Sequence, residues 1–157
     1  MKLARVAMLL AAAACALARP AIGQSGTRPS GFTAFTPVQV PPIARSEYAN
    51  LIDGGALETD GWTYLVLNLA AEMKGPVPGG NFGVVLIPDL QIFRRAFQTL
   101  GILPASLEYK VPVAAGAPTY FLAPQQRFEI GFPRYRIYYY NETGQGATLN
   151  LFAYRTR

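Results

Sequence analysis

Histidine is absent from this 157-residue chain. Without histidine, neither a Ser-His-Asp triad nor a Cys-His pair can activate a nucleophile, and no imidazole can bind zinc or copper. Acid–base catalysis near neutral pH also loses its usual side chain. We therefore expect a protein that is not an enzyme and that carries no metal or cofactor.

Cysteine and lysine are almost as scarce. Cys15 is the only cysteine, and because it lies in the N-terminal segment, the rest of the chain has no cysteine for a disulfide. Beyond that segment only Lys74 and Lys110 remain, and no Ser-x-x-Lys spacing occurs. No glycine-rich loop ends in the Lys-Ser or Lys-Thr pair of a phosphate-binding loop. These absences argue against Ser-Lys nucleophiles and against nucleotide chemistry.

The N-terminus, MKLARVAMLLAAAACALARPAIGQ, has the layout of a secretory signal peptide. Basic residues precede a short apolar run, and Ala21 and Gly23 are the small residues of a cleavage site after position 23. The uncharged stretch 6–18 is shorter than the roughly 20 residues that a membrane-spanning helix needs. We predict a signal peptide at 1–23 and a flexible linker at 24–31.

Two alternatives concern this segment. Cleavage after Ala18 is one, and cleavage before Cys15, which would leave a lipid-modified cysteine as a membrane anchor, is the other. Ala12 stands where lipoprotein signals usually carry a larger aliphatic residue, so cleavage after position 23 is preferred to lipid modification of Cys15. The expected location is periplasmic or extracellular, with lipid anchoring through Cys15 as the alternative.

Net charge falls when the leader is removed. The chain has 14 basic and 9 acidic residues, a formal charge of +5, and three of the basic residues lie in the leader, which leaves 11 against 9, or +2. The longest basic run is Arg94-Arg95. Nucleic-acid binding needs a clustered basic surface, so we expect no nucleic-acid partner.

Apolar residues in the remainder alternate in short runs bounded by glycine and proline, a pattern typical of β-strands. We predict strands at 32–40, 62–74, 82–88, 106–113 and 126–132, a closing hairpin at 134–155, and a short helix at 47–53. In 62–74 one face carries Leu65, Leu67, Leu69, Ala71 and Met73. The other face carries Trp62, Tyr64 and Val66, which indicates a central strand that is covered on both faces near its start. The predicted fold class is mainly β: a single antiparallel β-sandwich or jelly-roll-like domain at 32–157 with one short crossing α-helix.

The crossing helix is expected within 89–101, DLQIFRRAFQTLG. Asp89 is a suitable N-cap, and Gly101 is a suitable residue to follow the last turn. Four apolar residues recur at helical spacing and predict a stripe that faces the core: Leu90, Phe93, Phe97 and Leu100.

Carboxylates are the remaining catalytic candidates. A glycoside hydrolase needs two of them on either side of a sugar, and the candidates are Asp53, Glu58, Asp60, Glu72, Asp89, Glu108, Glu129 and Glu142. The segment 53–60, DGGALETD, carries three of them among glycines. It predicts a surface turn, with a Ca²⁺-binding loop as the alternative.

The aromatic hairpin RYRIYYYNETGQGATLNLFAYR is the best functional lead. Pairing Ile137 with Leu151 places one set of residues on a core face: Tyr135, Ile137, Tyr139, Leu149, Leu151 and Ala153. The same register places the other set on an outward aromatic and cationic face, which is the predicted binding site: Arg134, Arg136, Tyr138, Tyr140, Asn150, Phe152 and Tyr154.

Three functions are compatible with that outward face. Tyrosine and arginine are enriched at protein interfaces, so the leading expectation is a non-catalytic module that docks onto a protein partner or assembles with itself. Flat rings beside arginine and asparagine also suit a glycan, which makes a glycan-binding module at the cell envelope the second expectation. A carboxylate-dependent hydrolase is the third.

The leader yields a direct prediction. We expect the exported protein to begin at or near Gln24, because Ala21 and Gly23 form the cleavage site. N-terminal sequencing of the exported protein measures this. A mature chain that starts at a lipid-modified Cys15 would contradict the prediction and place the protein on a membrane.

Overall fold

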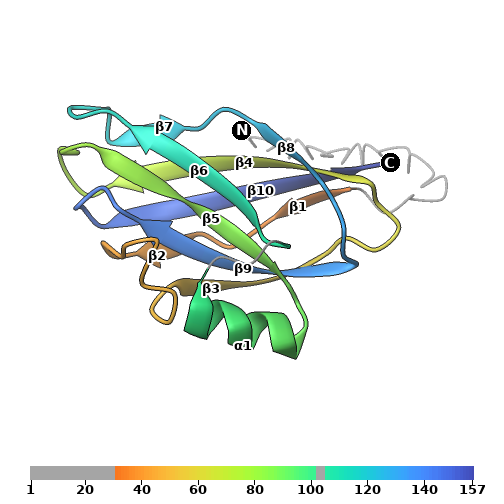
Figure 1. Cartoon of the computed structure of the whole chain (residues 1–157). Helices are drawn as coiled ribbons and strands as arrows, with labels where there is room; N and C mark the ends of the chain where they lie inside the picture. Colours follow the sequence, from red (N-terminus) through yellow and green to blue (C-terminus); the bar gives the residue numbers. More distant parts are fainter. Residues whose placement is uncertain (1–30, 102–104) are drawn as a thin grey trace, which may run out of the picture.

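The computed structural model describes residues 31–101 and 105–157 (Figure 1). The predicted signal peptide, Cys15 and positions 24–30 of the predicted linker lie outside the described residues. Gly31, the last linker position, is buried, and its carbonyl oxygen accepts hydrogen bonds from the backbone N–H and the Nε of Arg155. Gly31 is therefore attached to the end of the C-terminal strand.

Strands dominate the described residues. Their bounds are β1 Phe32–Ala34, β2 Val38–Val40, β3 Ile52–Glu58, β4 Tyr64–Met73, β5 Gly80–Pro88, β6 Leu107–Val113, β7 Tyr120–Leu122, β8 Gln126–Glu129, β9 Arg134–Asn141 and β10 Ala147–Thr156. The helix α1 spans Gln91–Leu100. No helix in 31–101 or 105–157 is long and apolar enough to cross a membrane.

The strands form two antiparallel sheets. In sheet A the order is β1-β10-β4-β7, with β2 also paired to β10 and β8 also paired to β4; in sheet B the order is β3-β9-β5-β6. Figure 1 shows the sheets facing each other, with α1 against sheet B. The prediction of a mainly β, antiparallel sandwich with one short helix is confirmed.

The main core lies between the two sheets. The predicted apolar face of β4, from Leu65 to Met73, is buried there, and β9 contributes Tyr135, Ile137 and Tyr139 from the other sheet. β4 has β10 on one side and β7 and β8 on the other, so the prediction of a central strand is confirmed. The prediction that its start is covered on both faces is wrong, because Tyr64 and Val66 are only half-buried on the outer side of sheet A. Alternation of apolar residues in the sequence predicts the buried residues of β4 and β9 in this core correctly, because successive side chains of a strand point to opposite faces and one face meets this core.

The predicted hairpin of residues 134–155 is wrong. β9 pairs with β3 and β5 in sheet B, whereas β10 pairs with β4 along its whole length in sheet A. Ile137 pairs with Gly55 and Leu86, and Leu151 pairs with Leu69. The six residues predicted to share a core face are all buried in the main core, but they meet across the sandwich instead of side by side in one sheet.

The connection between β9 and β10 carries the chain from one sheet to the other. Buried Asn141 donates hydrogen bonds through Nδ2 to the carbonyl oxygens of Val40 (3.1 Å) and Gln145 (2.7 Å). The Thr143 hydroxyl donates to Oδ1 of Asn141 at 2.7 Å. These contacts fix a wide turn, which lets β10 enter the other sheet. A tight hairpin turn would keep both strands in one sheet.

Two other predicted elements differ. The strand expected at 32–40 is two short strands, β1 and β2, separated around Pro37, whose missing N–H interrupts the ladder. The helix expected at 47–53 is a turn followed by β3. A Cβ on Gly54 in β3 would lie 2.2 Å from the ring of Tyr139, so this glycine gives the tyrosine room to enter the core.

α1 confirms the predicted helix, with two corrections. Leu90, not Asp89, occupies the N-cap and provides no side-chain cap, whereas Gly101 ends the helix with a positive φ of 85°. Phe97 is fully buried and Phe93 is partly buried, but Leu90 and Leu100 are exposed. The stripe is only half buried because α1 touches the outer surface of sheet B along one side.

We expect Phe97→Ala to destabilise the protein by about 3–5 kcal/mol, because this ring fills the contact between α1 and sheet B. Leu100→Ala is the matched control on the same helix and should stay within about 0.5 kcal/mol. Chemical denaturation of both variants measures this. Equal stabilities would show that α1 does not depend on Phe97 for its packing.

Candidate binding surface

The predicted binding residues divide between two opposite surfaces of the molecule. Arg134, Arg136, Tyr138 and Tyr140 lie on the outer side of β9 in sheet B, and Asn150, Phe152 and Tyr154 lie on the outer side of β10 in sheet A. The expectation that all of them form one surface is wrong, because β9 and β10 belong to different sheets.

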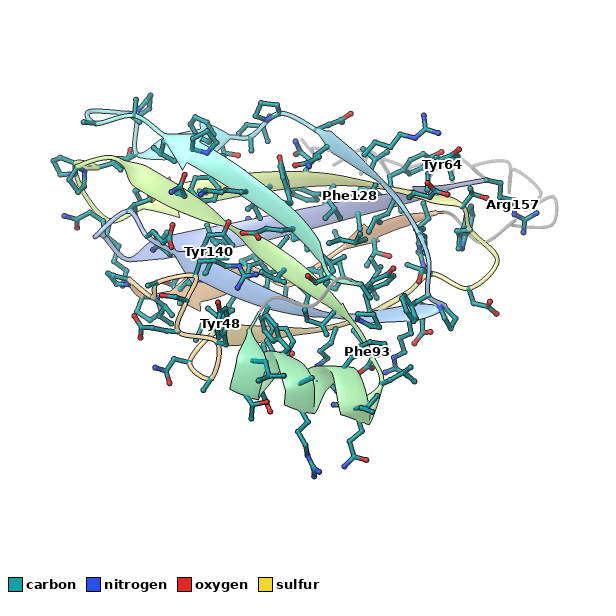
Figure 2. The ribbon with its side chains drawn as sticks, in the orientation of Figure 1. Tyr48, Tyr64, Phe93, Phe128, Tyr140 and Arg157 are labelled. Atoms are coloured by element: carbon teal, nitrogen blue, oxygen red, sulfur yellow. The ribbon has the colours of Figure 1, made fainter. Side chains whose placement is uncertain are left out.

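Tyr138 and Tyr140 are buried, with 5% and 0% of their surface exposed. They belong to a second apolar core between sheet B and α1, which also contains Leu51, Val85, Ile87 and Phe97, with Tyr48 and Phe93 at its margin (Figure 2). The rings of Tyr138 and Phe97 are 5.4 Å apart. The expectation that these tyrosines are exposed is wrong, because α1 and residues of the segment 43–51 pack on this side of sheet B.

Tyr140 is held by a charged partner inside this second core. Its hydroxyl donates to Oε1 of Glu108 at 3.0 Å, and the same oxygen lies 3.2 Å from Nε of Arg45. Burial raises the pKa of the Tyr140 phenol, and the negative charge of Glu108 raises it further. Tyr140 is therefore a protonated hydrogen-bond donor at physiological pH, and its function is structural.

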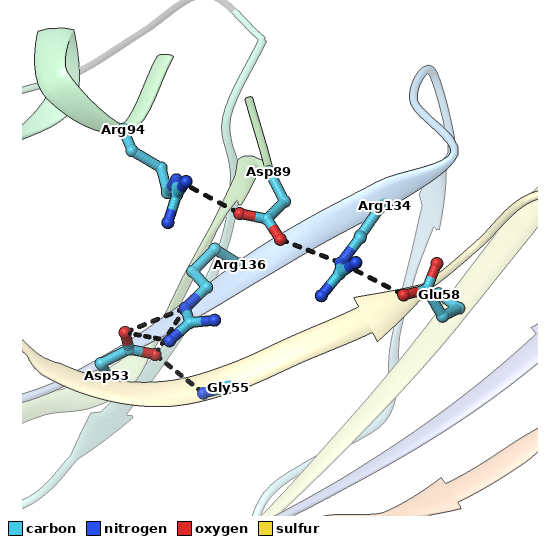
Figure 3. Close-up of polar contacts among 7 residues, drawn as sticks. All are labelled: Asp53, Gly55, Glu58, Asp89, Arg94, Arg134 and Arg136. Atoms are coloured by element: carbon cyan, nitrogen blue, oxygen red, sulfur yellow. Dashed lines mark hydrogen bonds and ion pairs between the residues drawn. The ribbon is translucent and has the colours of Figure 1, made fainter. Parts of the chain in front are cut away.

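Arg134 and Arg136 are bound by carboxylates on neighbouring elements (Figure 3). Nη2 of Arg136 lies 2.6 Å from Oδ2 of Asp53 on β3, and this hydrogen bond raises the pKa of the guanidinium. Nε of Arg134 lies 2.9 Å from Asp89 and 3.1 Å from Glu58.

Asp89 links this charge cluster to the helix. Its Oδ1 lies 3.3 Å from Nε of Arg94 on α1, and its Oδ2 lies 2.9 Å from Nε of Arg134 on β9. Asp89 is nearly buried, whereas the two arginines are about half exposed. The cluster therefore joins α1, β9 and β3, and its charges balance within the fold.

The segment 53–60, predicted as a turn or a Ca²⁺ loop, is mostly strand β3. Its carboxylates Asp53 and Glu58 bind arginines. Outside this segment, the carboxylate of Glu142 accepts hydrogen bonds from the backbone N–H of Arg45 and from Nδ2 of Asn81. Within the described parts of the chain, no group of three His, Cys, Asp or Glu side chains could hold a metal ion. These carboxylates serve as partners of basic and amide groups.

The outer side of sheet A is different, because aromatic side chains lie there in the open. Phe32 on β1 pairs with Tyr154 on β10, which pairs with Val66 on β4. Phe32 and Tyr154 are each 52% exposed, and the rings of Phe32 and Phe152 stack 6.4 Å apart. We call this surface the open face; it consists of Phe32, Tyr64, Val66, Asn68, Tyr120, Leu122, Asn150, Phe152 and Tyr154.

The open face contains a hollow of about 340 Å³. Phe32, Phe152 and Tyr154 provide rings on one side of the hollow, and Asn68 and Gln125 provide amides. Nδ2 of Asn68 donates to the carbonyl oxygen of Ala123 at 2.7 Å, which fixes the orientation of this amide. Rings beside an oriented amide can hold a flat ligand or the side chains of another protein.

Sequence reasoning found Asn150, Phe152 and Tyr154 of this face and missed the rest. Alternation in 62–74 does place Tyr64, Val66 and Asn68 on the second side of β4, which is a usable signal. Tyr120 and Leu122 carried no signal, because β7 has only three residues and follows a loop rich in alanine and proline. Their place on the open face comes from pairing with Glu72 and Ala70.

The sheet edges are poor places for a partner strand. β6 carries Lys110 and Pro112, and β3 carries an irregularity between Asp53 and Gly55. Each edge of sheet A consists of two short strands instead of one long strand. These are β1 and β2 beside β10, and β7 and β8 beside β4. Short, interrupted, charged or proline-containing edges resist strand addition, so a partner is more easily accommodated on the open face.

Comparison with known proteins adds no family to this description. No protein-family model matches the chain. No curated protein matches it in sequence. The open face must therefore be interpreted from its own geometry and chemistry.

Asp89→Asn separates the two roles that have been assigned to this residue. Asparagine caps helices as well as aspartate does, so a capping role predicts no change in the free energy of unfolding. Loss of the ion pairs with Arg94 and Arg134 should instead lower this free energy by about 1–3 kcal/mol. Chemical denaturation at low and high salt measures the difference, which should shrink as salt rises. Glu129→Gln, an exposed carboxylate on β8, is the control and should be neutral.

Proposed function

We propose that the protein is an exported, non-catalytic β-sandwich module that docks onto a protein surface through the open face. The observation that carries this proposal is the exposure of Phe32, Tyr120, Leu122 and Tyr154 on one side of one sheet. In the described part of the chain, sheet B has a helix packed over its outer side and sheet A has none. Exposed apolar surface concentrated in this way is characteristic of an interaction site.

The composition of the open face supports a protein partner. Its centre is aromatic and aliphatic with small amides, and its charged neighbours, Glu72, Arg127 and Glu129, are exposed. Cζ of Arg127 lies 3.7 Å from the ring centroid of Tyr64, so this charge also covers aromatic surface. Aromatic residues at the centre and charge toward the rim are typical of protein interfaces.

Export rests on the N-terminal pattern of residues 1–23. The absence of cysteine from the rest of the chain is compatible with an oxidising compartment, because no free thiol is exposed to it. We propose a periplasmic or extracellular location, with a lipid anchor at Cys15 as the alternative.

A glycan is the second candidate ligand. The hollow between Phe152, Tyr154 and Asn68 favours it, because a sugar ring can stack on aromatic rings while its hydroxyls bind an oriented amide. The two candidates differ in extent. A glycan would engage the hollow, whereas a protein would also cover Tyr120 and Leu122 on β7, which do not line the hollow.

We expect Tyr154→Ser to weaken association with a protein partner by about 2 kcal/mol or more and to change fold stability by less than about 1 kcal/mol, because the ring is half exposed. Capture from native envelope extract, sedimentation of the purified protein and thermal melting measure these effects. Lys110→Ser, an exposed change on β6 of the other sheet, is the matched control and should bind normally.

Two outcomes would contradict the protein-docking proposal. One is normal capture and normal sedimentation of Tyr154→Ser together with Leu122→Ser. The other is capture that survives protease treatment of the extract, is competed by soluble polysaccharide and is lost only in Tyr154→Ser. That second outcome would establish the glycan function instead.

A further inference from the structure

Large apolar side chains are exposed on only two surfaces of the described chain. Phe32, Tyr120, Leu122 and Tyr154 lie on the open face of sheet A, and Leu90, Ile92 and Leu100 lie on α1 and the residue that precedes it. Single exposed apolar residues are ordinary on any protein, but Phe32, Tyr120, Leu122 and Tyr154 all point to the same side of sheet A. Their segregation into two groups indicates two contact surfaces.

The helix presents a regular apolar row to solvent. Ile92, Ala96 and Leu100 follow one another at a spacing of four residues, which aligns them along one side of α1. Ile92 is 74% exposed and Leu100 is 76% exposed, Ala96 between them is half-buried, and Phe97 attaches the adjoining side of the helix to sheet B. Arg95, also exposed, lies three residues from Ile92 and adds a positive charge beside the row.

The two surfaces lie on opposite sides of the molecule. The open face is the outer side of sheet A, the main core separates sheet A from sheet B, and the second core separates sheet B from α1. Figure 1 shows the same succession of layers. One copy therefore cannot cover its own open face with its own helix row.

We propose that the helix row of one copy docks onto the open face of the next copy, so that the protein assembles head to tail. This proposal rests on the docking role proposed for the open face and identifies its partner as a second copy of this chain. The contact is heterologous, because the two surfaces that meet are different.

Shape and charge both fit this pairing. Helix-recognition sites bind the apolar residues of one helix side in an apolar groove, and the open face offers a hollow lined by Phe32, Phe152 and Tyr154. Glu72 is exposed on β4 and pairs with Tyr120, so a negative charge lies beside Tyr120 and Leu122. Arg95 beside the helix row supplies the opposite charge, and such complementarity sets orientation and partner choice.

Head-to-tail contact has a consequence that a symmetric dimer lacks. Each added copy leaves one free helix row and one free open face, so assembly continues until a ring closes or a filament grows. A variant with only one damaged surface can still use its other surface. When two variants that are damaged on different surfaces are mixed, assembly should therefore end at a dimer of one copy of each.

The test mixes Ile92→Asp, which damages the helix row, with Leu122→Asp, which damages the open face. Both side chains are exposed, so both variants should fold and melt like the wild type. Analytical ultracentrifugation should show concentration-dependent assemblies of the wild-type protein. Each variant alone should be monomeric, with self-association weakened at least about 30-fold, and the mixture should form a 1:1 heterodimer and nothing larger.

A charge exchange tests the orientation within the same contact. Arg95→Glu should weaken self-association and Glu72→Arg should do the same, whereas the double variant should regain assembly. Failure of the double variant to regain any assembly would overturn the proposed juxtaposition of Arg95 and Glu72.

Three results would overturn the head-to-tail proposal. Both single variants could assemble like the wild type, or Leu122→Asp alone could lose assembly, which would mean that open faces pair with each other. The wild type could also remain monomeric at every concentration. If Tyr154→Ser still loses a partner from envelope extract in that last case, the docking function stands and only the identity of the partner is wrong.

Discussion

Strand β9 is buried on both of its faces, and the rest of the structure is arranged around that burial. Tyr135, Ile137 and Tyr139 enter the core between the sheets, while Tyr138 and Tyr140 enter the core beneath α1. Burying so many aromatic side chains gives the largest favourable contribution available to a chain of this size. Sheet B needs α1 because its outer side would otherwise expose these rings.

This double burial imposes constraints on neighbouring groups. Among the described residues the buried hydroxyl of Tyr139 has no hydrogen-bond partner, which costs about 1–3 kcal/mol, and its desolvation raises the pKa of that phenol. Gly54 must lack a side chain to admit the same ring. Around the second core, Glu108 satisfies Tyr140, and Asp89 connects α1 to β9. These polar groups are therefore paired with one another within the fold.

Coverage of sheet B leaves sheet A as the aromatic surface of the molecule. The described elements place no helix over Phe32, Phe152 and Tyr154, and the interrupted strands at the edges of sheet A limit strand addition there. The same arrangement leaves Ile92 and Leu100 of α1 exposed. Two contact surfaces on opposite sides are a direct consequence of a sandwich with a third layer on one side only.

The turn between β9 and β10 decides which residues share a surface. Asn141, Glu142 and Thr143 match the pattern of an N-glycosylation acceptor, but Asn141 is fully buried and its Nδ2 donates to two backbone carbonyls. Its role is to hold the turn. Because that turn sends β10 into the other sheet, Tyr138 and Tyr154, which share one predicted face, lie on opposite sides of the protein.

The sequence by itself determined the strands β4, β5 and β9, the position of α1 with Gly101 at its end, and the residues of β4, β9 and β10 that enter the main core. These features depend on local alternation and helical spacing, which a short stretch of chain already contains. Tertiary structure alone decided that β9 and β10 separate, that α1 covers Tyr138 and Tyr140, and that Asp89 binds arginines instead of capping the helix. Alternation states which residues share a face, but it does not state which distant element covers that face. That choice depends on contacts between residues far apart in the chain, and it left Tyr154 exposed while burying Tyr140.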